Sequence, residues 1–208
     1  MLKYPSVLIG NAVSAFSKLP GIGEKTALRL VLHLLKQDPE KAEAFSQAVS
    51  VMRRDIRFCN RCHGVSDYDL CNVCSNTSRD QSVVCVVESI REVIAIENTS
   101  VFNGVYHVLG GLISPVDGIG PDQLQAHSLF KRVETGEIRE VIMALSPTIE
   151  GDTTIFYLSR KLREFPVQIT SIARGVSFGG ELEYADELTL AKSISSRLPF
   201  ESYLVKNA

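Results

Sequence analysis

The sequence feature that most constrains the fold of this chain is a pair of Cys-x-x-Cys motifs separated by eight residues. Cys59 and Cys62 form the first motif, and Cys71 and Cys74 form the second. Four thiolates at this spacing make the tetrahedral ligand set that Zn²⁺ prefers, and four protein ligands leave no position for water or substrate. The spacing therefore predicts a structural zinc site, not a catalytic one.

Two disulfides, or four unrelated core cysteines, are the alternatives. The N-terminal residues contain neither a signal peptide nor a transmembrane segment, so we expect a cytoplasmic protein with no membrane contact. Disulfides are rare in that reducing environment, which favours metal. His63 is a possible substitute for one thiolate, although we favour a position on the surface or behind the ligands. Cys85 lies in an apolar run and is expected to be a small buried hydrophobe.

Charge is distributed unevenly along the 208 residues. The formal net charge is −2, but residues 1–58 hold nine Lys and Arg against five Asp and Glu, a net +4. The remainder holds thirteen against nineteen, a net −6. Any contact with nucleic acid is therefore expected in the N-terminal part.

Helical periodicity dominates the first 56 residues. Apolar positions predict helices over residues 5–19, 24–36 and 39–56. In the third helix the apolar positions form a single stripe, which we expect to be buried. Its members are Phe45, Val49, Met52 and Ile56.

The first two helices are joined by Leu19-Pro-Gly-Ile-Gly23, the sequence form of a helix-hairpin-helix. The glycines allow a tight turn and leave amide groups at the start of the second helix free to face a phosphate. Lys25 and Arg29 are four residues apart and share one face of that helix, so we expect them to contact the DNA backbone. A plain turn with a solvated basic face, or a role in self-association, stays open.

Beyond residue 82 the pattern changes to short Val- and Ile-rich runs that alternate with helical segments. Runs that are apolar on both faces predict an α/β fold with a buried parallel sheet. Strands are predicted at 83–87, 105–109, 138–145 and 167–172, and helices near 89–98, 123–135, 153–165 and 185–197. Ser89 and Glu92 form a capping box that fixes the start of the first of these helices.

Acidic residues follow two of the predicted strands. Glu88 comes after the first strand, and Glu150 and Asp152 come after the third. Because the carboxyl ends of parallel strands meet at one edge of the sheet, these carboxylates can converge on one Mg²⁺ of the kind that serves phosphoryl transfer. The other interpretation is that they are helix N-terminal carboxylates favoured by the dipole. Both interpretations stay open.

Two Gly-rich stretches, 107–121 and 172–184, are too long for minimal turns and are predicted to be ordered functional loops. The first of them lacks the Gly-Lys-Ser/Thr ending of a phosphate-binding P-loop. Arg174 in the second stretch either contacts a partner or phosphate or forms a structural salt bridge.

With these segments in order, nearly the whole chain resembles the bacterial RecR family of recombination mediators. The resemblance rests on Leu19-Pro-Gly-Ile-Gly23 with Lys25 and Arg29, the four cysteines, Val86-Val87-Glu88, the 107–121 loop, Glu150-Gly-Asp152, and Ile172-Ala-Arg174-Gly with Gly180-Glu-Leu-Glu-Tyr184. The chain departs from the family at Leu145-Ser146-Pro147, where many relatives have Thr-Asn-Pro, and at Thr153-Thr154, where Ala-Thr is common. The acidic set is intact.

The resemblance implies four parts: a helix-hairpin-helix region at 1–56, a four-cysteine zinc finger at 57–78, a Toprim domain at 79–175 and a C-terminal segment at 176–208. It implies dimers and ring-shaped tetramers that can encircle DNA. Carried over by position, Lys25 and Arg29 would be DNA contacts and the four cysteines zinc ligands. The Toprim acidic residues would be Glu88, Glu150 and Asp152.

The resemblance also implies a function. Members of the family act with RecO and RecF to load RecA onto gapped single-stranded DNA, which would place this chain at the nucleoid. Their Toprim domain is regarded as a partner-binding surface without catalysis. The alternative from another class is a Mg²⁺-dependent Toprim enzyme, such as a primase or nuclease, although none of the six tyrosines lies in a strand-cleavage motif. A third interpretation is a zinc adaptor that binds only protein.

Overall fold

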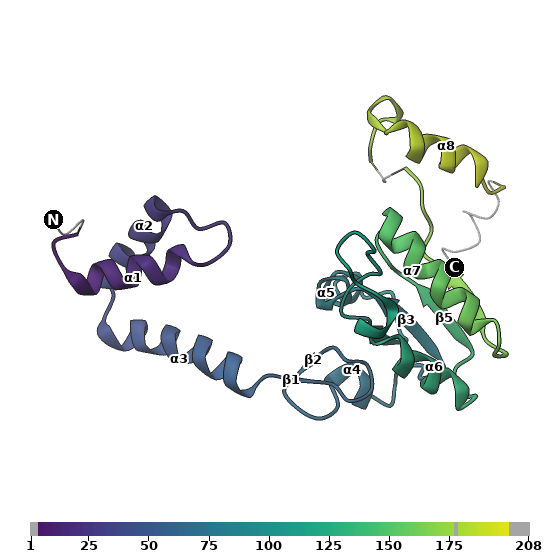
Figure 1. Cartoon of the computed structure of the whole chain (residues 1–208), viewed down its shortest axis with the longest axis horizontal. Helices are drawn as coiled ribbons and strands as arrows, with labels where there is room; N and C mark the ends of the chain where they lie inside the picture. The colour runs from purple at the N-terminus through teal and green to yellow at the C-terminus, as the bar shows by residue number, and fades with distance from the viewer. Residues whose placement is uncertain (1–3, 177–178, 200–208) are drawn as a thin grey trace. The chain divides into compact units, whose positions relative to one another are not determined.

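The computed structural model of the chain describes residues 4–176 and 179–199 (Figure 1). The chain divides into two compact units, Met1–Ile56 and Arg57–Ala208. Within the described ranges, no helix combines the length and the apolar character that a membrane crossing needs.

The first unit consists of the three predicted helices, which begin and end within two residues of the expected positions. They are α1 (Val7–Ser17), α2 (Glu24–Leu35) and α3 (Pro39–Asp55). The Ser6 hydroxyl caps α1 by accepting a hydrogen bond from the Leu8 N–H at 3.2 Å. Among residues 4–56, only Val13 of α1 and Ala27 and Val31 of α2 are fully buried. The core of this unit is therefore small.

The predicted burial of the apolar stripe on α3 is wrong. Phe45 and Val49 are each 48% exposed and Met52 is 54% exposed, and Ile56 is half-buried. Phe45 stacks on Phe16 of α1 at a centroid distance of 6.3 Å, but the rest of the stripe has no layer across it within the described part of the unit. Three short helices cannot enclose a second core, so this face of α3 is left apolar and exposed.

The second unit begins with the cysteine-containing segment. A short hairpin pairs β1 (Arg57–Phe58) with β2 (Val65–Ser66) in antiparallel fashion, and the one-turn helix α4 (Asn72–Ser75) follows. Helix α4 then packs beside one strand of the sheet that follows in the chain.

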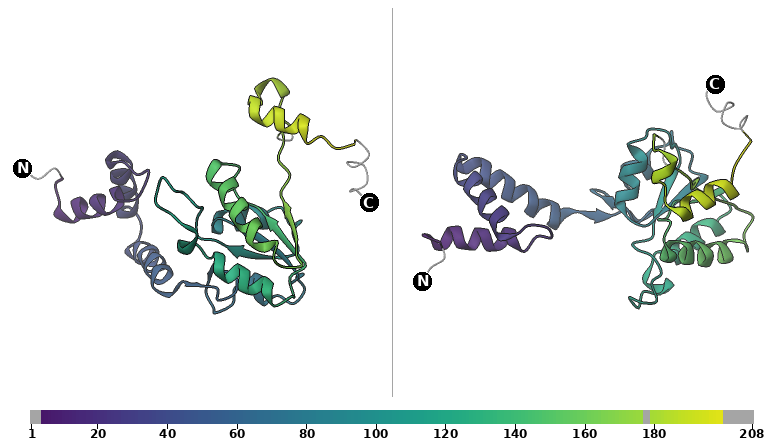
Figure 2. Two further views of the ribbon diagram at one scale, coloured as in Figure 1. Left: turned by 45° about the vertical axis from the view of Figure 1, so that its right-hand side comes forward. Right: turned by 90° about the horizontal axis from the view of Figure 1, so that it is seen from above.

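The predicted parallel sheet forms the centre of the second unit. Its four strands lie in the order β4-β3-β5-β6. Its strands are β3 (Val83–Val87), β4 (Val105–Val108), β5 (Glu140–Met143) and β6 (Gln168–Ser171). Its helices are α5 (Ile90–Glu97), η1 (Pro121–Gln123), α6 (Ala126–Glu134), α7 (Ile149–Leu162), η2 (Leu182–Tyr184) and α8 (Glu187–Ser195). Figure 2 shows α6 and α7 together on one face of the sheet and α5 on the other.

Successive side chains of β3 point to opposite faces of the sheet and contribute to the apolar core on each face. Val84 and Val86 pack with α6 and α7, whereas Cys85 and Val87 pack on the α5 side. Cys85 is therefore the buried hydrophobe that the sequence predicts, and burial raises the pKa of its thiol to about 12. The predicted capping box at the start of α5 is also present.

The structure corrects three further expectations. Helix α7 begins at Ile149, four residues before the predicted start, so Glu150 and Asp152 lie in its first turn, the helix N-terminal position that the sequence left as one of two interpretations. His107 is a fully buried residue of β4 and not part of the Gly-rich loop. The edge strand β6 is exposed or half-buried along its length, because no further strand or helix layer from the described residues covers it.

Parts of two predicted segments lie outside the described residues. Residues 177 and 178 belong to the second Gly-rich loop, and residues 200–208 end the C-terminal segment predicted at 176–208. The predicted helix at 185–197 is present as α8.

A polar network joins the exit of the cysteine segment to the sheet. The Arg79 guanidinium donates to both carboxylate oxygens of Glu97 at the end of α5, and also to the Gly104 carbonyl at 3.1 Å. The Tyr106 hydroxyl donates to Glu97 at 2.6 Å. The side chains of Arg79 and Glu97 are only 16% and 29% exposed, so the pair is shielded from water.

We predict that Glu97→Gln lowers the free energy of unfolding by about 2 kcal/mol, because a shielded guanidinium loses its charged partner. The Arg79 guanidinium holds the pKa of Glu97 below its ordinary value of 4.5. The stabilisation is therefore full above that value and is lost as the pH falls through the lowered pKa. Urea unfolding at pH 7 and below pH 4 measures both effects.

Asp69→Asn is the matched control, because it removes the partner of Arg57 in a pair whose side chains are 63% and 76% exposed. A loss in Asp69→Asn equal to that in Glu97→Gln would contradict the proposed importance of the shielded network.

Candidate metal centre and nucleic-acid interface

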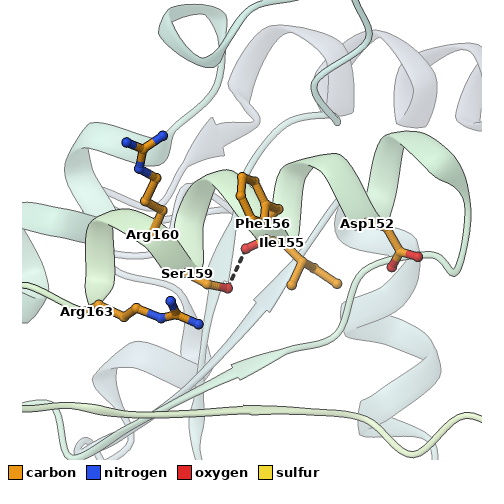
Figure 3. A pocket seen from close by; sticks show the side chains of 6 residues that line it. All are labelled: Asp152, Ile155, Phe156, Ser159, Arg160 and Arg163. Atoms are coloured by element: carbon orange, nitrogen blue, oxygen red, sulfur yellow. Dashed lines mark hydrogen bonds between the residues drawn. The ribbon is translucent and has the colours of Figure 1, made fainter.

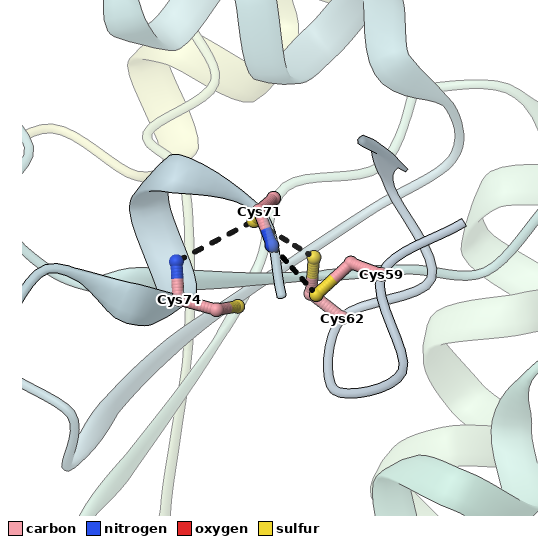
Figure 4. A group of neighbouring side chains, drawn as sticks. All are labelled: Cys59, Cys62, Cys71 and Cys74. Atoms are coloured by element: carbon pink, nitrogen blue, oxygen red, sulfur yellow. Dashed lines mark hydrogen bonds between the residues drawn. The ribbon is translucent and has the colours of Figure 1, made fainter. Parts of the chain in front are cut away.

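The four cysteines of the two motifs meet at one point. Their sulfur atoms all lie within 4.8 Å of one another, and none forms a disulfide. Figure 4 shows the four side chains turned toward a common point. Cys62 and Cys71 approach to 3.6 Å between sulfurs. Cys59, Cys62 and Cys74 are buried and Cys71 is half-buried. The two motifs therefore present one compact tetrathiol cluster.

Backbone amides around the cluster are directed at sulfur. The N–H groups of Gly64, Cys71 and Cys74 donate to the sulfurs of Cys62, Cys59 and Cys71, each at 3.4 Å. Such donors stabilise negative charge on sulfur. Hydrogen bonds among the thiols lower the pKa of Cys71 but raise those of Cys62 and Cys74, so without a cation Cys71 is the one of these three that is favoured as a thiolate.

This donor set fits Zn²⁺, which binds four thiolates tetrahedrally and supplies the positive charge that they need. The cluster leaves no open ligand position for a substrate. His63 is not among the converging ligand atoms. It is half-buried, and its ring packs edge-on against that of His107 at 5.3 Å between centroids.

The cluster is attached directly to the sheet. The Val108 N–H at the end of β4 donates to the Cys62 carbonyl at 2.8 Å. His107, one residue earlier, keeps its Nε2 2.7 Å from the Gln125 carbonyl, and burial lowers the pKa of this histidine to about 3. His107 is therefore neutral at physiological pH and places no positive charge beside the cysteines.

A positive charge near the cysteine cluster belongs to Arg132. It extends from α6 and donates to the Tyr106 carbonyl of β4 at 2.9 Å. Burial lowers the pKa of Arg132, and the nearby thiols of Cys74, Cys62 and Cys59 oppose that shift. In the part of the chain that the structure describes, no carboxylate pairs with it. No local pattern indicates this residue, because the cluster and α6 are more than fifty residues apart.

The predicted basic face is present on α2. Lys25 and Arg29 are both exposed and line a groove of about 460 Å³. The same groove includes His33 and Lys36, which extend the basic face along the helix. Sequence reasoning missed these two, although their spacing from Arg29 places them on the same face. The N-cap of α2 is Gly23, whose backbone leaves the first amides of the helix without a side-chain cap.

The three predicted acidic residues lie at the carboxyl edge of the sheet but do not converge. Glu88 accepts a hydrogen bond from the Ser146 hydroxyl at 3.1 Å, and Asp152 forms a 2.6 Å ion pair with Arg174. That guanidinium lowers the pKa of Asp152. Over residues 4–176 and 179–199, only the four cysteines form a group of three or more potential ligands. Arg174 makes the structural salt bridge that the sequence left open.

We predict that a strong chelator removes one zinc ion per chain and lowers the melting temperature, because metal binding to the tetrathiol cluster contributes folding free energy. Cys71→Ser should lose stoichiometric zinc by elemental analysis. Cys85→Ala is the control: it removes a cysteine outside the cluster and should keep the metal. Zinc retention by Cys71→Ser would contradict the assignment.

We also predict that Arg132→Met releases zinc to a chelator roughly tenfold faster than the parent chain, since outer partners of metal ligands tune affinity by at least that factor. Four thiolates around Zn²⁺ carry a net charge of −2, which Arg132 partly neutralises. The neighbouring exposed Lys131→Met is the matched control.

The melting temperatures of the Arg132 variant separate this effect from simple packing. Arg132→Met should lower the melting temperature of the zinc-loaded protein but not that of the zinc-free protein. Without zinc the Cys62 and Cys74 thiols are protonated, because their pKa values are raised, so much of the negative charge that attracts the Arg132 guanidinium is absent. Equal destabilisation of both forms would contradict the charge argument.

Four protein-family models match successive parts of the chain. They are the RecR helix-hairpin-helix (residues 9–52), the RecR zinc finger domain with four cysteines (56–76), the Toprim domain (82–173) and the RecR C-terminal region (175–197). The second of these spans all four cysteines, so the match and the clustered sulfurs both support structural zinc.

Curated relatives match over almost the entire length. The "Recombination protein RecR" of Cytophaga hutchinsonii is 55% identical over 97% of this chain and 98% of its own. The protein of that name from Bacteroides thetaiotaomicron is 57% identical over 95% and 97%, and the one from Flavobacterium johnsoniae is 53% identical over 99% and 100%. Identity at this level over full length leaves one conclusion: the chain belongs to the RecR family of recombination proteins.

Proposed function

We propose that this chain is a DNA-binding mediator of recombinational repair, which acts with RecO and RecF at the bacterial nucleoid to load RecA onto gapped single-stranded DNA. The observation that carries the DNA-binding part is the basic groove on α2 directly after the Gly-Ile-Gly turn. The names of the relatives support the role in recombination.

The α2 groove suits a phosphate backbone better than a base edge. Lys25, Arg29, His33 and Lys36 follow one another along the helix, and the 1.5 Å rise per residue spreads them over about 16 Å. Lys25, Arg29 and Lys36 supply the positive charge of this row, and cations spaced along a helix meet successive phosphates, which carry no sequence information. We therefore assign Lys25 and Arg29 to sequence-independent DNA contact.

We assign Cys59, Cys62, Cys71 and Cys74 as the ligands of the structural zinc. The parts of the chain are taken to be residues 1–56, 57–78, 79–175 and 176–208, in the order hairpin region, zinc finger, Toprim domain and C-terminal segment. We propose no catalytic role for any of them.

Glu88, Glu150 and Asp152 are proposed to form part of a partner-binding surface. Two observations favour this role over Mg²⁺ catalysis. Arg174 neutralises Asp152, and the three carboxylates do not form a ligand group among the described residues. Binding of RecO or RecF at this edge of the sheet requires no metal.

We further propose that the chain forms homo-oligomers, as dimers and ring-shaped tetramers. The exposed apolar stripe on α3 and an apolar groove of about 330 Å³ between the helices of the first unit support this assembly. Single exposed apolar residues are ordinary, but a continuous stripe is typical of an interface.

We predict that Lys25→Ala/Arg29→Ala binds a gapped duplex at least about tenfold more weakly than the parent at about 0.1 M salt, with a log–log salt slope smaller by about two units. The reason is the loss of two phosphate contacts, each of which releases about one counterion. Fluorescence anisotropy at several salt concentrations measures both quantities.

The matched control is Lys41→Ala/Arg53→Ala, which removes two exposed cations from α3 and leaves α2 unchanged. Light scattering establishes that both variants keep the parent's oligomeric state. If the two double variants lose the same affinity and slope, the α2 groove has no special role and DNA contact lies elsewhere.

A further inference from the structure

A second surface with the features of a nucleic-acid contact lies on α7, in the net acidic part of the chain after residue 58. The inner face of this helix is buried against the sheet through Gly151, Thr154, Leu158 and Leu162. Phe156, Arg160 and Arg163 follow one another at intervals of four and three residues on the outward face. All three are exposed, and the Phe156 side chain is 71% exposed.

These side chains border a groove of about 430 Å³ that also includes Asp152, Ile155 and Ser159. Figure 3 shows Phe156 between Asp152 at one end of the helix and the two arginines at the other. Ser159 uses its hydroxyl within the helix, where it donates to the Ile155 carbonyl. The arginine end of the groove is therefore positively charged, with an aromatic ring beside it.

Two properties make this charge available to a ligand. Arg160 and Arg163 place two cations within four residues, in a part of the chain (residues 59–208) where acidic residues outnumber basic ones nineteen to thirteen. Among the ion pairs of the described ranges, none involves Arg160 or Arg163. Asp152 at the far end is already paired with Arg174.

We propose that this face binds single-stranded DNA, with one base stacked on the Phe156 ring and flanking phosphates held by Arg160 and Arg163. The proposal rests on the proposed function and adds a second contact to that of α2. An exposed aromatic ring next to cations that are free of ion pairs is the combination that binds single strands without sequence preference, because every base has a flat face.

An apolar protein segment fits this surface less well. A peptide anchor requires a pocket enclosed by apolar side chains, whereas four of the six groove residues here are polar or charged. Phe156 and Ile155 are the two apolar members, and Phe156 presents most of its surface outward. A stacking base needs only that one exposed ring.

The chain contains no tryptophan, which allows a direct test. Phe156→Trp introduces a single indole at the proposed stacking position, and a stacked base quenches indole fluorescence. We expect oligo-dT to quench this reporter at the concentrations at which anisotropy shows binding. The control reporter is Val101→Trp, placed at an 85% exposed position just beyond α5, which packs on the opposite face of the sheet; its fluorescence should not change.

A charge test is independent of the reporter. Arg160→Ala/Arg163→Ala should reduce the salt slope of oligo-dT binding by about two units. Its matched control is Lys131→Ala/Lys161→Ala, which removes two exposed cations from the same unit. Lys161 lies five residues from Phe156, on another flank of α7. Phe156→Leu keeps an apolar side chain without a planar ring and should weaken binding about fivefold or more.

The possible outcomes distinguish failure of the α7 contact from failure of the proposed DNA-binding function. If the parent chain binds no single-stranded DNA, the proposed function fails and this inference fails with it. If the parent binds but Phe156→Trp is not quenched, or the two arginines behave like the lysine control, only the α7 contact is overturned. Quenching by an acidic peptide and not by oligo-dT would assign the face to a protein partner and also overturn it.

Discussion

The convergence of four thiols at one point is the interaction on which the first part of the second unit depends. Between Arg57 and Asn76, a stretch described in full, the only cluster of buried side chains consists of these cysteines, while Phe58 and Tyr68 are largely exposed. Since Val73 is the one residue of this segment that packs against the cores of the sheet, metal binding to the thiols is expected to supply much of the folding free energy of the segment. The same cluster fixes the segment to the sheet, through the Cys62–Val108 hydrogen bond and through the charge of Arg132.

The parallel sheet then determines where charged groups gather. Because β3 lies between β4 and β5, their carboxyl ends form one edge, at which Glu88, Ser146 and the start of α7 meet. Gly151 allows this approach: a Cβ there would lie 1.9 Å from the Ser146 carbonyl oxygen. Helix α7 thus presents its first turn to the sheet edge and its outward face to solvent. The same helix therefore contributes acidic side chains to the sheet edge and an aromatic, basic face to the solvent.

Much of this arrangement is predictable from local pattern. The cysteine spacing, the apolar runs of the strands and the Ser89 capping box act over a few residues, and the clustering of the four cysteines, the parallel sheet and the capping box are all present. The failures have a different origin. The apolar pattern places the start of α7 at residue 153, four residues too late, because the packing of Gly151 against the Ser146 carbonyl is evident only in the folded chain. Periodicity identified the apolar stripe on α3 but contains no information on what covers it. Arg132 meets the cysteines only after the sheet has formed.

The small core of the first unit has a consequence for how the protein responds to dilution. The first unit has three fully buried side chains among its described residues, with partly buried ones packed around them, so a layer that covered the exposed apolar face of α3 would add substantially to its stability. If that cover is another copy of the chain, mass action makes the stability of the unit rise and fall with protein concentration. The basic groove of α2 belongs to this unit, so the fraction of chains with a folded groove would rise with protein concentration. The proposed DNA-binding face would then depend on how many copies of the chain are present.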